Sequence, residues 1–169
     1  MNASNWSWAR NARAFHRLCV VDAIQGTYSW WKPADSFART NNSRPVITAH
    51  AASVIGAAGV ARINEFWNYP RGWDSGKGHP LSPNSLWLFE EFLRLYPGFS
   101  SAPSVFLTIE GNLVLGWEDR VGSRIEAEFS PAGLELYLGS DDNEFVFDSD
   151  EDGLNALVVR LQEHEAHAA

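Results

Sequence analysis

Downstream of Pro103, apolar residues alternate with polar ones, which is the two-residue period of strands that bury one face. The pattern predicts five strands, over residues 104–109, 112–118, 123–129, 133–138 and 143–147. The links between them are short and rich in Gly, Asp and Ser, so consecutive strands should pair as an antiparallel meander. One face of this sheet should carry the apolar side chains of Ile125, Ala127, Phe129, Leu134, Leu136 and Leu138.

Elsewhere the apolar residues recur every three or four positions, which is the period of helices. Helices are predicted over 8–24, over 46–68, from Pro83 to the Pro97-Gly98 stop, and over about 150–165. Ser82 followed by Pro83 is a strong helix start. The order predicts an α+β domain: N-terminal helices, an antiparallel meander of four to five strands, and a C-terminal helix packed on one sheet face. Residues 1–45 are predicted to form an aromatic, basic extension packed on or flanking a core domain over 46–169.

The length of 169 residues and the apolar content of 45% suit one domain with a substantial core. Cys19 is the one cysteine, so an intrachain disulfide is excluded and a reducing cytoplasm is expected. The N-terminus lacks the charged and apolar regions of a signal peptide. The stretch 49–61 is too short and too polar to span a membrane, so a cytoplasmic protein without a membrane partner is predicted.

Charge is distributed unevenly along the chain. Residues 1–78 contain nine Lys or Arg and four Asp or Glu, whereas residues 79–169 contain four and seventeen. The net charge of −8 therefore arises in the second half. An acidic half disfavours direct contact with nucleic acid and favours basic protein partners.

A loop over 69–83 joins the second and third predicted helices. Its glycines allow positive φ angles, and Trp73 is expected to pack between two helices while Asp74 accepts backbone N–H groups. The loop resembles a pattern in small bacterial and phage proteins, Leu/Tyr-Pro-x-Gly-Trp-Asp-Gly-x-Gly-x-x-Pro-x-Ser-Pro, with Ser75 in place of the commoner glycine. The matching residues are Tyr69, Pro70, Gly72, Trp73, Asp74, Gly76, Pro80, Ser82 and Pro83. The resemblance extends over about residues 64–140 and implies a phage or mobile-element context, with no activity attached.

Candidate chemical motifs each have a simpler structural interpretation. Lys77 is not followed by Ser or Thr, as a phosphate-binding loop requires. The acidic run from Asp148 to Asp152 resembles a calcium loop, but Val159 stands where a glutamate is needed, so helix capping is favoured. Cys19 with His16 lacks an orienting group, and the histidines lack metal-ligand spacing. No catalytic residue, cofactor or metal is therefore predicted, and a non-enzymatic protein is expected.

The face of the sheet opposite the core is acidic. Glu126, Glu128, Glu135 and Tyr137 should point outward on adjacent strands, and like charges across a ladder are destabilising. Further acids are predicted to rim this face: Glu118, Asp119, Asp141, Asp142 and Glu144. Two interpretations remain open, namely ordinary solubilising charge or a surface built for a basic partner.

We expect a protein that binds, and thereby inhibits, a basic nucleic-acid-handling complex of a bacterial host, as anti-CRISPR-like inhibitors do. The acidic face would steer the partner, and aromatic residues such as Trp30 and Trp31 would anchor it. If exposed, these two tryptophans would also favour a homodimer. The alternatives are an antitoxin or immunity partner of a neighbouring gene product, and an enzyme of unknown class.

Overall fold

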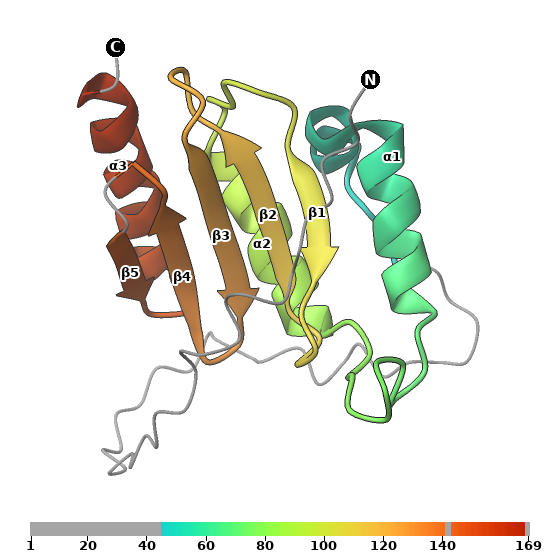
Figure 1. Ribbon diagram of the computed structural model, residues 1–169. Coiled ribbons are helices and arrows are strands. Elements are labelled where there is room, and N and C mark those ends of the chain that lie inside the picture. The colour runs from blue at the N-terminus through green and yellow to red at the C-terminus, as the bar shows by residue number, and fades with distance from the viewer. Residues whose placement is uncertain (1–44, 141–142, 168–169) are drawn as a thin grey trace, which may run out of the picture. The chain divides into compact units, whose positions relative to one another are not determined.

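The computed structural model describes residues 45–140 and 143–167, and it confirms the α+β class. The helices are α1 (Ala49–Trp67), α2 (Pro83–Leu95) and α3 (Glu151–His167). The strands are β1 (Ser104–Leu107), β2 (Leu113–Glu118), β3 (Arg124–Ser130), β4 (Gly133–Leu138) and β5 (Asn143–Phe147) (Figure 1). The predicted helix over 8–24 and nearly all of the predicted extension lie outside the described residues.

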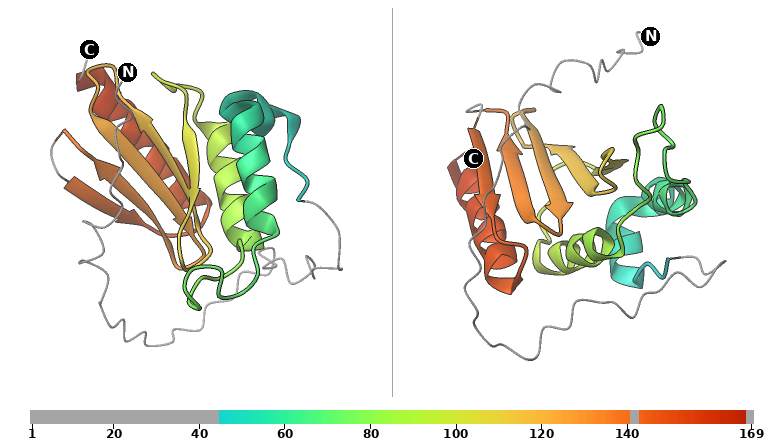
Figure 2. Two further views of the ribbon diagram at one scale, coloured as in Figure 1. Left: turned by 45° about the vertical axis from the view of Figure 1, so that its right-hand side comes forward. Right: turned by 90° about the horizontal axis from the view of Figure 1, so that it is seen from below.

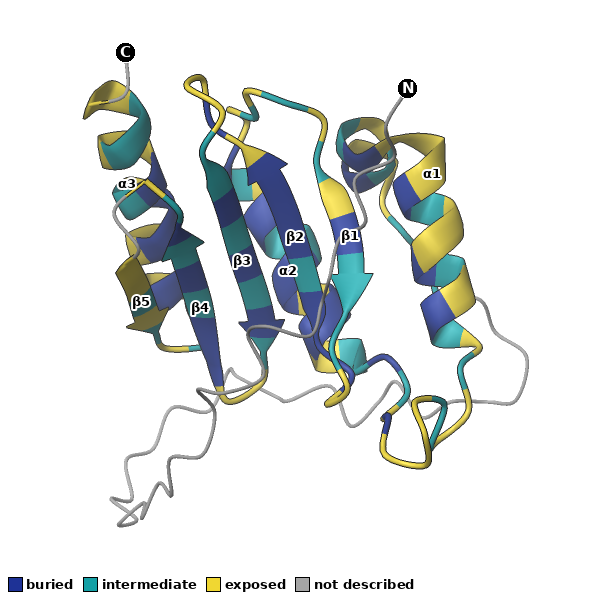
Figure 3. Ribbon diagram, in the orientation of Figure 1, coloured by how far each residue is buried: buried dark blue, intermediate teal, exposed yellow. Residues whose placement is uncertain are grey.

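The five strands form one antiparallel sheet in the order β1-β2-β3-β4-β5, which is the predicted meander. The strand boundaries agree with the alternating pattern to within two residues. Leu115 pairs with Ala127, which in turn pairs with Leu136, so the apolar positions of neighbouring strands share one face. The predicted inward side chains of β3 and β4 are buried there (Figure 3).

Side-chain caps fix where the helices begin. The Thr48 hydroxyl accepts the Ala51 N–H at α1, and the Ser82 hydroxyl accepts the Ser85 N–H at α2. At α3 the Asp150 carboxylate accepts the N–H of Gly153 over 2.8 Å. The acidic run before α3 therefore supplies a helix cap, as its sequence favours.

All three helices lie to one side of the sheet or beside its β1 edge (Figures 1 and 2). α2 packs on β2 and β3, α3 packs on β4 and β5, and α1 packs on α2 and β1. Aromatic rings fill the layer between α2 and the sheet, where the Phe92 ring lies 5.1 Å from Phe129 and 6.4 Å from Trp117, centroid to centroid. The opposite face of the sheet carries no described helix.

The loop after α1 is closed by its own contacts. Trp73 packs on Tyr69 with ring centroids 4.9 Å apart, and its indole N–H donates to the carbonyl oxygen of His79 over 2.8 Å. The sequence places Trp73 between two helices, but these described contacts are with the loop and its start. Asp74 accepts the Lys77 N–H through its backbone carbonyl, whereas carboxylate acceptance is predicted. Ser75 has a φ of 49°, in the left-handed region that favours glycine.

Candidate interaction surface on the open face of the sheet

The strand register gathers the predicted acidic residues on the face that no described helix covers. In one row Val114, Glu128, Glu135 and Val146 are successive cross-strand partners, and in the next row Gly116, Glu126, Tyr137 and Glu144 are. Side chains of cross-strand partners share a face. We define the outer face by the outward side chains of β2 to β5 that carry charge or bulk: Val114, Glu118, Arg124, Glu126, Glu128, Glu135, Tyr137, Glu144 and Val146.

Glu128 and Glu135 lie directly opposite each other in the middle of the outer face. The Asn112 side-chain amide donates to Glu128 Oε1 over 2.9 Å. Burial raises the pKa of Glu128, and the charges of Glu135 and Glu110 add to the rise against the opposing effect of the Asn112 hydrogen bond. Burial also raises the pKa of Glu135, with a contribution from Glu144. The fold thus holds two like charges side by side in partly desolvated positions.

Glu126 differs because it forms an ion pair with Arg124 from the same strand. Its side chain is 27% exposed, and the side chains of Glu128, Glu135 and Tyr137 are likewise half-buried. The sequence predicts that Glu126, Glu128 and Glu135 lie on one exposed face. The structure instead places these carboxylates in the middle of the sheet, where side chains of the neighbouring strands partly cover them from solvent.

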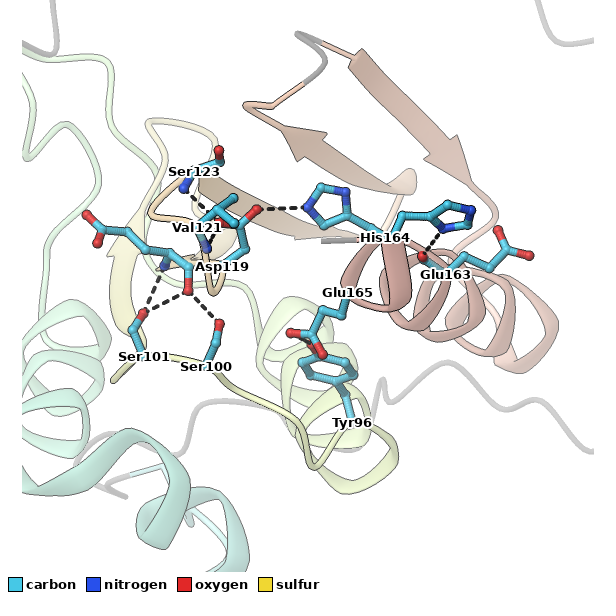
Figure 4. Close-up of polar contacts among 11 residues, drawn as sticks. Tyr96, Ser100, Ser101, Asp119, Val121, Ser123, Glu163, His164 and Glu165 are labelled. Atoms are coloured by element: carbon cyan, nitrogen blue, oxygen red, sulfur yellow. Dashed lines mark hydrogen bonds and ion pairs between the residues drawn. The ribbon is translucent and has the colours of Figure 1, made fainter. Parts of the chain in front are cut away.

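Asp119 requires a correction, because it does not lie on the exposed rim. Its side chain is 0% exposed and one oxygen accepts the N–H groups of Val121 and Ser123 across the β2–β3 turn (Figure 4). Its other oxygen lies 3.1 Å from Nε2 of His164 on α3. A turn carboxylate surrounded by backbone donors folds inward, so Asp119 stabilises the hairpin and is not available to a partner.

The contacts of Asp119 also set its ionisation. Burial acts to raise the pKa of this carboxyl, but the hydrogen bonds from Ser123, His164 and Val121 outweigh burial and lower it. Nearby, the Tyr96 hydroxyl donates to Glu165 Oε1 over 2.7 Å, and burial is the main cause that raises the Tyr96 pKa. These contacts tie the C-terminal turns of α3 to the β2–β3 turn and to the end of α2. Sequence reasoning missed them because the partners are 45 and 69 residues apart.

An Asp–His pair occurs in catalytic triads, where the histidine also contacts a nucleophilic hydroxyl. The His164 side chain is only 9% exposed and Asp119 is fully buried. Within 45–140 and 143–167, the hydroxyl contacts of the neighbouring Ser100 and Ser101 go to the backbone of Glu118 and not to His164. The arrangement is therefore suited to holding two elements together.

Of the other predicted partner-binding and rim residues, two are exposed and four lie outside the described residues. Glu118 is exposed at the end of β2, opposite Arg124, and Glu144 is exposed on β5. Trp30, Trp31, Asp141 and Asp142 lie outside the described residues. In the described part of the chain no three metal-binding side chains cluster, and no helix combines the length and apolar character needed to cross a bilayer.

An open hollow of about 440 Å³ lies beside the loop after α1. Arg71 and Glu110 give its lining charges of both signs, together with His79, Pro80, Leu81, Ser82 and Pro83. Within the described residues, no ion pair or side-chain hydrogen bond joins Arg71, His79 and Glu110, so the hollow has no assembled acid–base pair.

Comparison of the chain with protein-family models, curated proteins and solved structures found no match. The resemblance of the loop over 69–83 to phage and bacterial proteins therefore stays a prediction. The outer face must be interpreted from its own geometry.

Proposed function

We propose that the protein is a non-enzymatic interaction protein whose outer face binds a basic protein surface. The observation that supports this proposal is the pair Glu128 and Glu135. They stand opposite each other, partly desolvated, on a face with no described covering helix. Arg124 pairs with Glu126 on the same face, whereas no ion pair among the described residues neutralises Glu128 or Glu135. A surface that only served solubility would intersperse charges of both signs and leave them in water.

Relief of the repulsion between Glu128 and Glu135 would make a favourable contribution to the free energy of binding a basic partner. Cationic groups placed over Glu128 and Glu135 would remove the mutual repulsion, and burial in an interface would strengthen the new ion pairs. The acidic second half of the chain would also accelerate association by long-range attraction.

The partner that fits best is a nucleic-acid-handling protein, because its basic groove is already complementary to closely spaced negative charges. Occupation of that groove by the outer face would exclude nucleic acid and inhibit the partner. The loop over 69–83 resembles a pattern of phage and mobile-element proteins. This resemblance favours a bacterial defence complex as the target, as for anti-CRISPR-like inhibitors.

The test uses immobilised full-length protein, a nuclease-treated bacterial lysate and a salt gradient. The charge-reversal variant is Glu126→Lys/Glu128→Lys/Glu135→Lys. The matched control is Asp74→Lys/Asp152→Lys/Glu163→Lys, which makes the same charge change at exposed positions off the outer face. We expect basic nucleic-acid-binding proteins to be retained by the wild type and the control, eluted by salt, and lost from the outer-face variant. Equal retention by both variants would contradict the proposal.

A further inference from the structure

The two edges of the sheet are finished differently. At β1, helix α1 lies alongside (Figure 1). Arg62 from α1 places its guanidinium 5.1 Å from the centroid of the Phe106 ring. At the other edge, the described elements that contact β5 are β4 and α3. α3 packs on the inner face, where the Arg160 guanidinium lies 4.4 Å from the Phe145 ring centroid. Among the described elements, none runs along the outer edge of β5 (Figure 2).

The register identifies which backbone groups point to that edge. The N–H of Gly139 donates to the Arg124 carbonyl and so continues the β3–β4 ladder. The backbone groups of the odd-numbered residues of β4 therefore form their hydrogen bonds with β3. The even residues of β4 must then bond to β5, and their partners are Asn143, Phe145 and Phe147. The N–H and C=O groups of Glu144 and Val146 therefore point away from the sheet.

β5 carries one charged side chain, Glu144, but lacks the other usual devices that protect an edge strand. The sequence Asn143–Phe147 has no proline, lysine or arginine, and its pairing with β4 runs without a bulge. The Val146 side chain belongs to the outer face and is 72% exposed. Natural sheets usually block such an edge or use it to bind an extended segment.

We propose that the β5 edge binds an extended basic segment of the partner by strand addition. The added strand would exchange main-chain hydrogen bonds with Glu144 and Val146. Its side chains beside these residues would share the outer face with them, so a lysine or arginine would stand beside Glu144 and an apolar side chain beside Val146. The inference rests on the proposed function and adds the conformation in which the partner binds.

Charge selects a basic segment over a second copy of this chain. Two copies paired through β5 would bring two outer faces together, each with Glu135 and Glu144 near the junction, between chains of net charge −8. Like charges across a ladder oppose pairing, whereas cationic side chains at the same positions favour it.

The experiment titrates the isotope-labelled full-length protein with a capped peptide. In this peptide, lysine and valine alternate at every second position and threonine fills the positions between. We expect the amides of Glu144 and Val146 to gain protection from hydrogen exchange. Val146→Pro removes an N–H that the β4 ladder does not use, and should weaken peptide binding at least about tenfold. Val146→Ala keeps that N–H and should weaken binding less.

The outcomes separate this inference from the proposed function. The peptide could bind and shift the NMR resonances of Glu126 and Glu128 while the amides of Glu144 and Val146 gain no protection from hydrogen exchange. In that case strand addition is wrong, but binding by the outer face stands. Absence of binding, or equal binding to the Val146→Pro variant, would overturn the inference. So would preferential binding of a peptide with glutamate in place of lysine, or a dimer of the free protein that Val146→Pro dissociates.

Discussion

Neutralising the central carboxylates of the outer face should stabilise the fold. Glu128→Gln/Glu135→Gln removes a directly opposed like-charge pair and keeps an acceptor for Asn112. A cross-strand like-charge pair costs a few tenths to about 1 kcal/mol, and both carboxylates are also partly desolvated. We expect a gain of about 1 kcal/mol at neutral pH, which is about 2–4 °C in Tm for a protein of this size.

The pH dependence provides a second, independent check. Both carboxyls have pKa values raised above the ordinary value of 4.5, so the native state holds their protons more tightly than the unfolded state does. The destabilisation therefore grows as pH rises above 4.5 through the native pKa values, and it is absent below 4.5. The gain in the variant should shrink toward zero in acid.

Thermal unfolding followed by circular dichroism between pH 4.5 and pH 8 measures both effects. Glu163→Gln on α3 is the control, because it removes an exposed carboxylate that lies off the outer face and is paired with Arg160. A double variant that is less stable than the wild type at neutral pH, or whose gain is the same at all pH values, would refute the reasoning.

Two further predictions concern the fold around this surface. Asp119→Ala leaves the N–H groups of Val121 and Ser123 without their acceptor, and it should lower the free energy of unfolding measured with denaturant by about 3 kcal/mol. Because the Asp119 pKa is lowered, the stability that its carboxylate contributes is present above pH 3.8 and is lost as pH falls through its native pKa. If the variant loses little stability and its stability falls in acid as that of the wild type does, this role of Asp119 is contradicted. Ser75→Gly relieves a positive φ and should stabilise the protein by about 0.5–1 kcal/mol, whereas destabilisation would show that the serine side chain matters more than the backbone angle.

Much of the fold could be predicted because its signals are local. The alternation after Pro103 identified each strand, and the Ser82-Pro83 pair located the start of α2 to the residue. The same alternation placed Glu126, Glu128 and Glu135 on one face, because a period of two fixes the side of every residue once the register is known.

The remaining features depend on contacts between distant residues. Asp119 has the sequence context of an exposed turn, but backbone donors within the turn and the approach of His164 across 45 residues together bury it. The contacts of Trp73 depend on how the loop closes onto Tyr69, which no periodicity encodes. Which sheet edge has a helix beside it follows from the path of α1, and this too is settled only by tertiary packing.

In the proposed function, the outer face holds an unfavourable charge arrangement that a basic partner relieves. The most direct test of this function is the dissociation constant of the purified retained partner for the wild type, the Glu126→Lys/Glu128→Lys/Glu135→Lys variant and the Asp74→Lys/Asp152→Lys/Glu163→Lys control, at equal ionic strength. We expect reversal on the outer face to weaken binding by at least about a hundredfold, while the control changes it far less. Equal affinities for the two variants would contradict it.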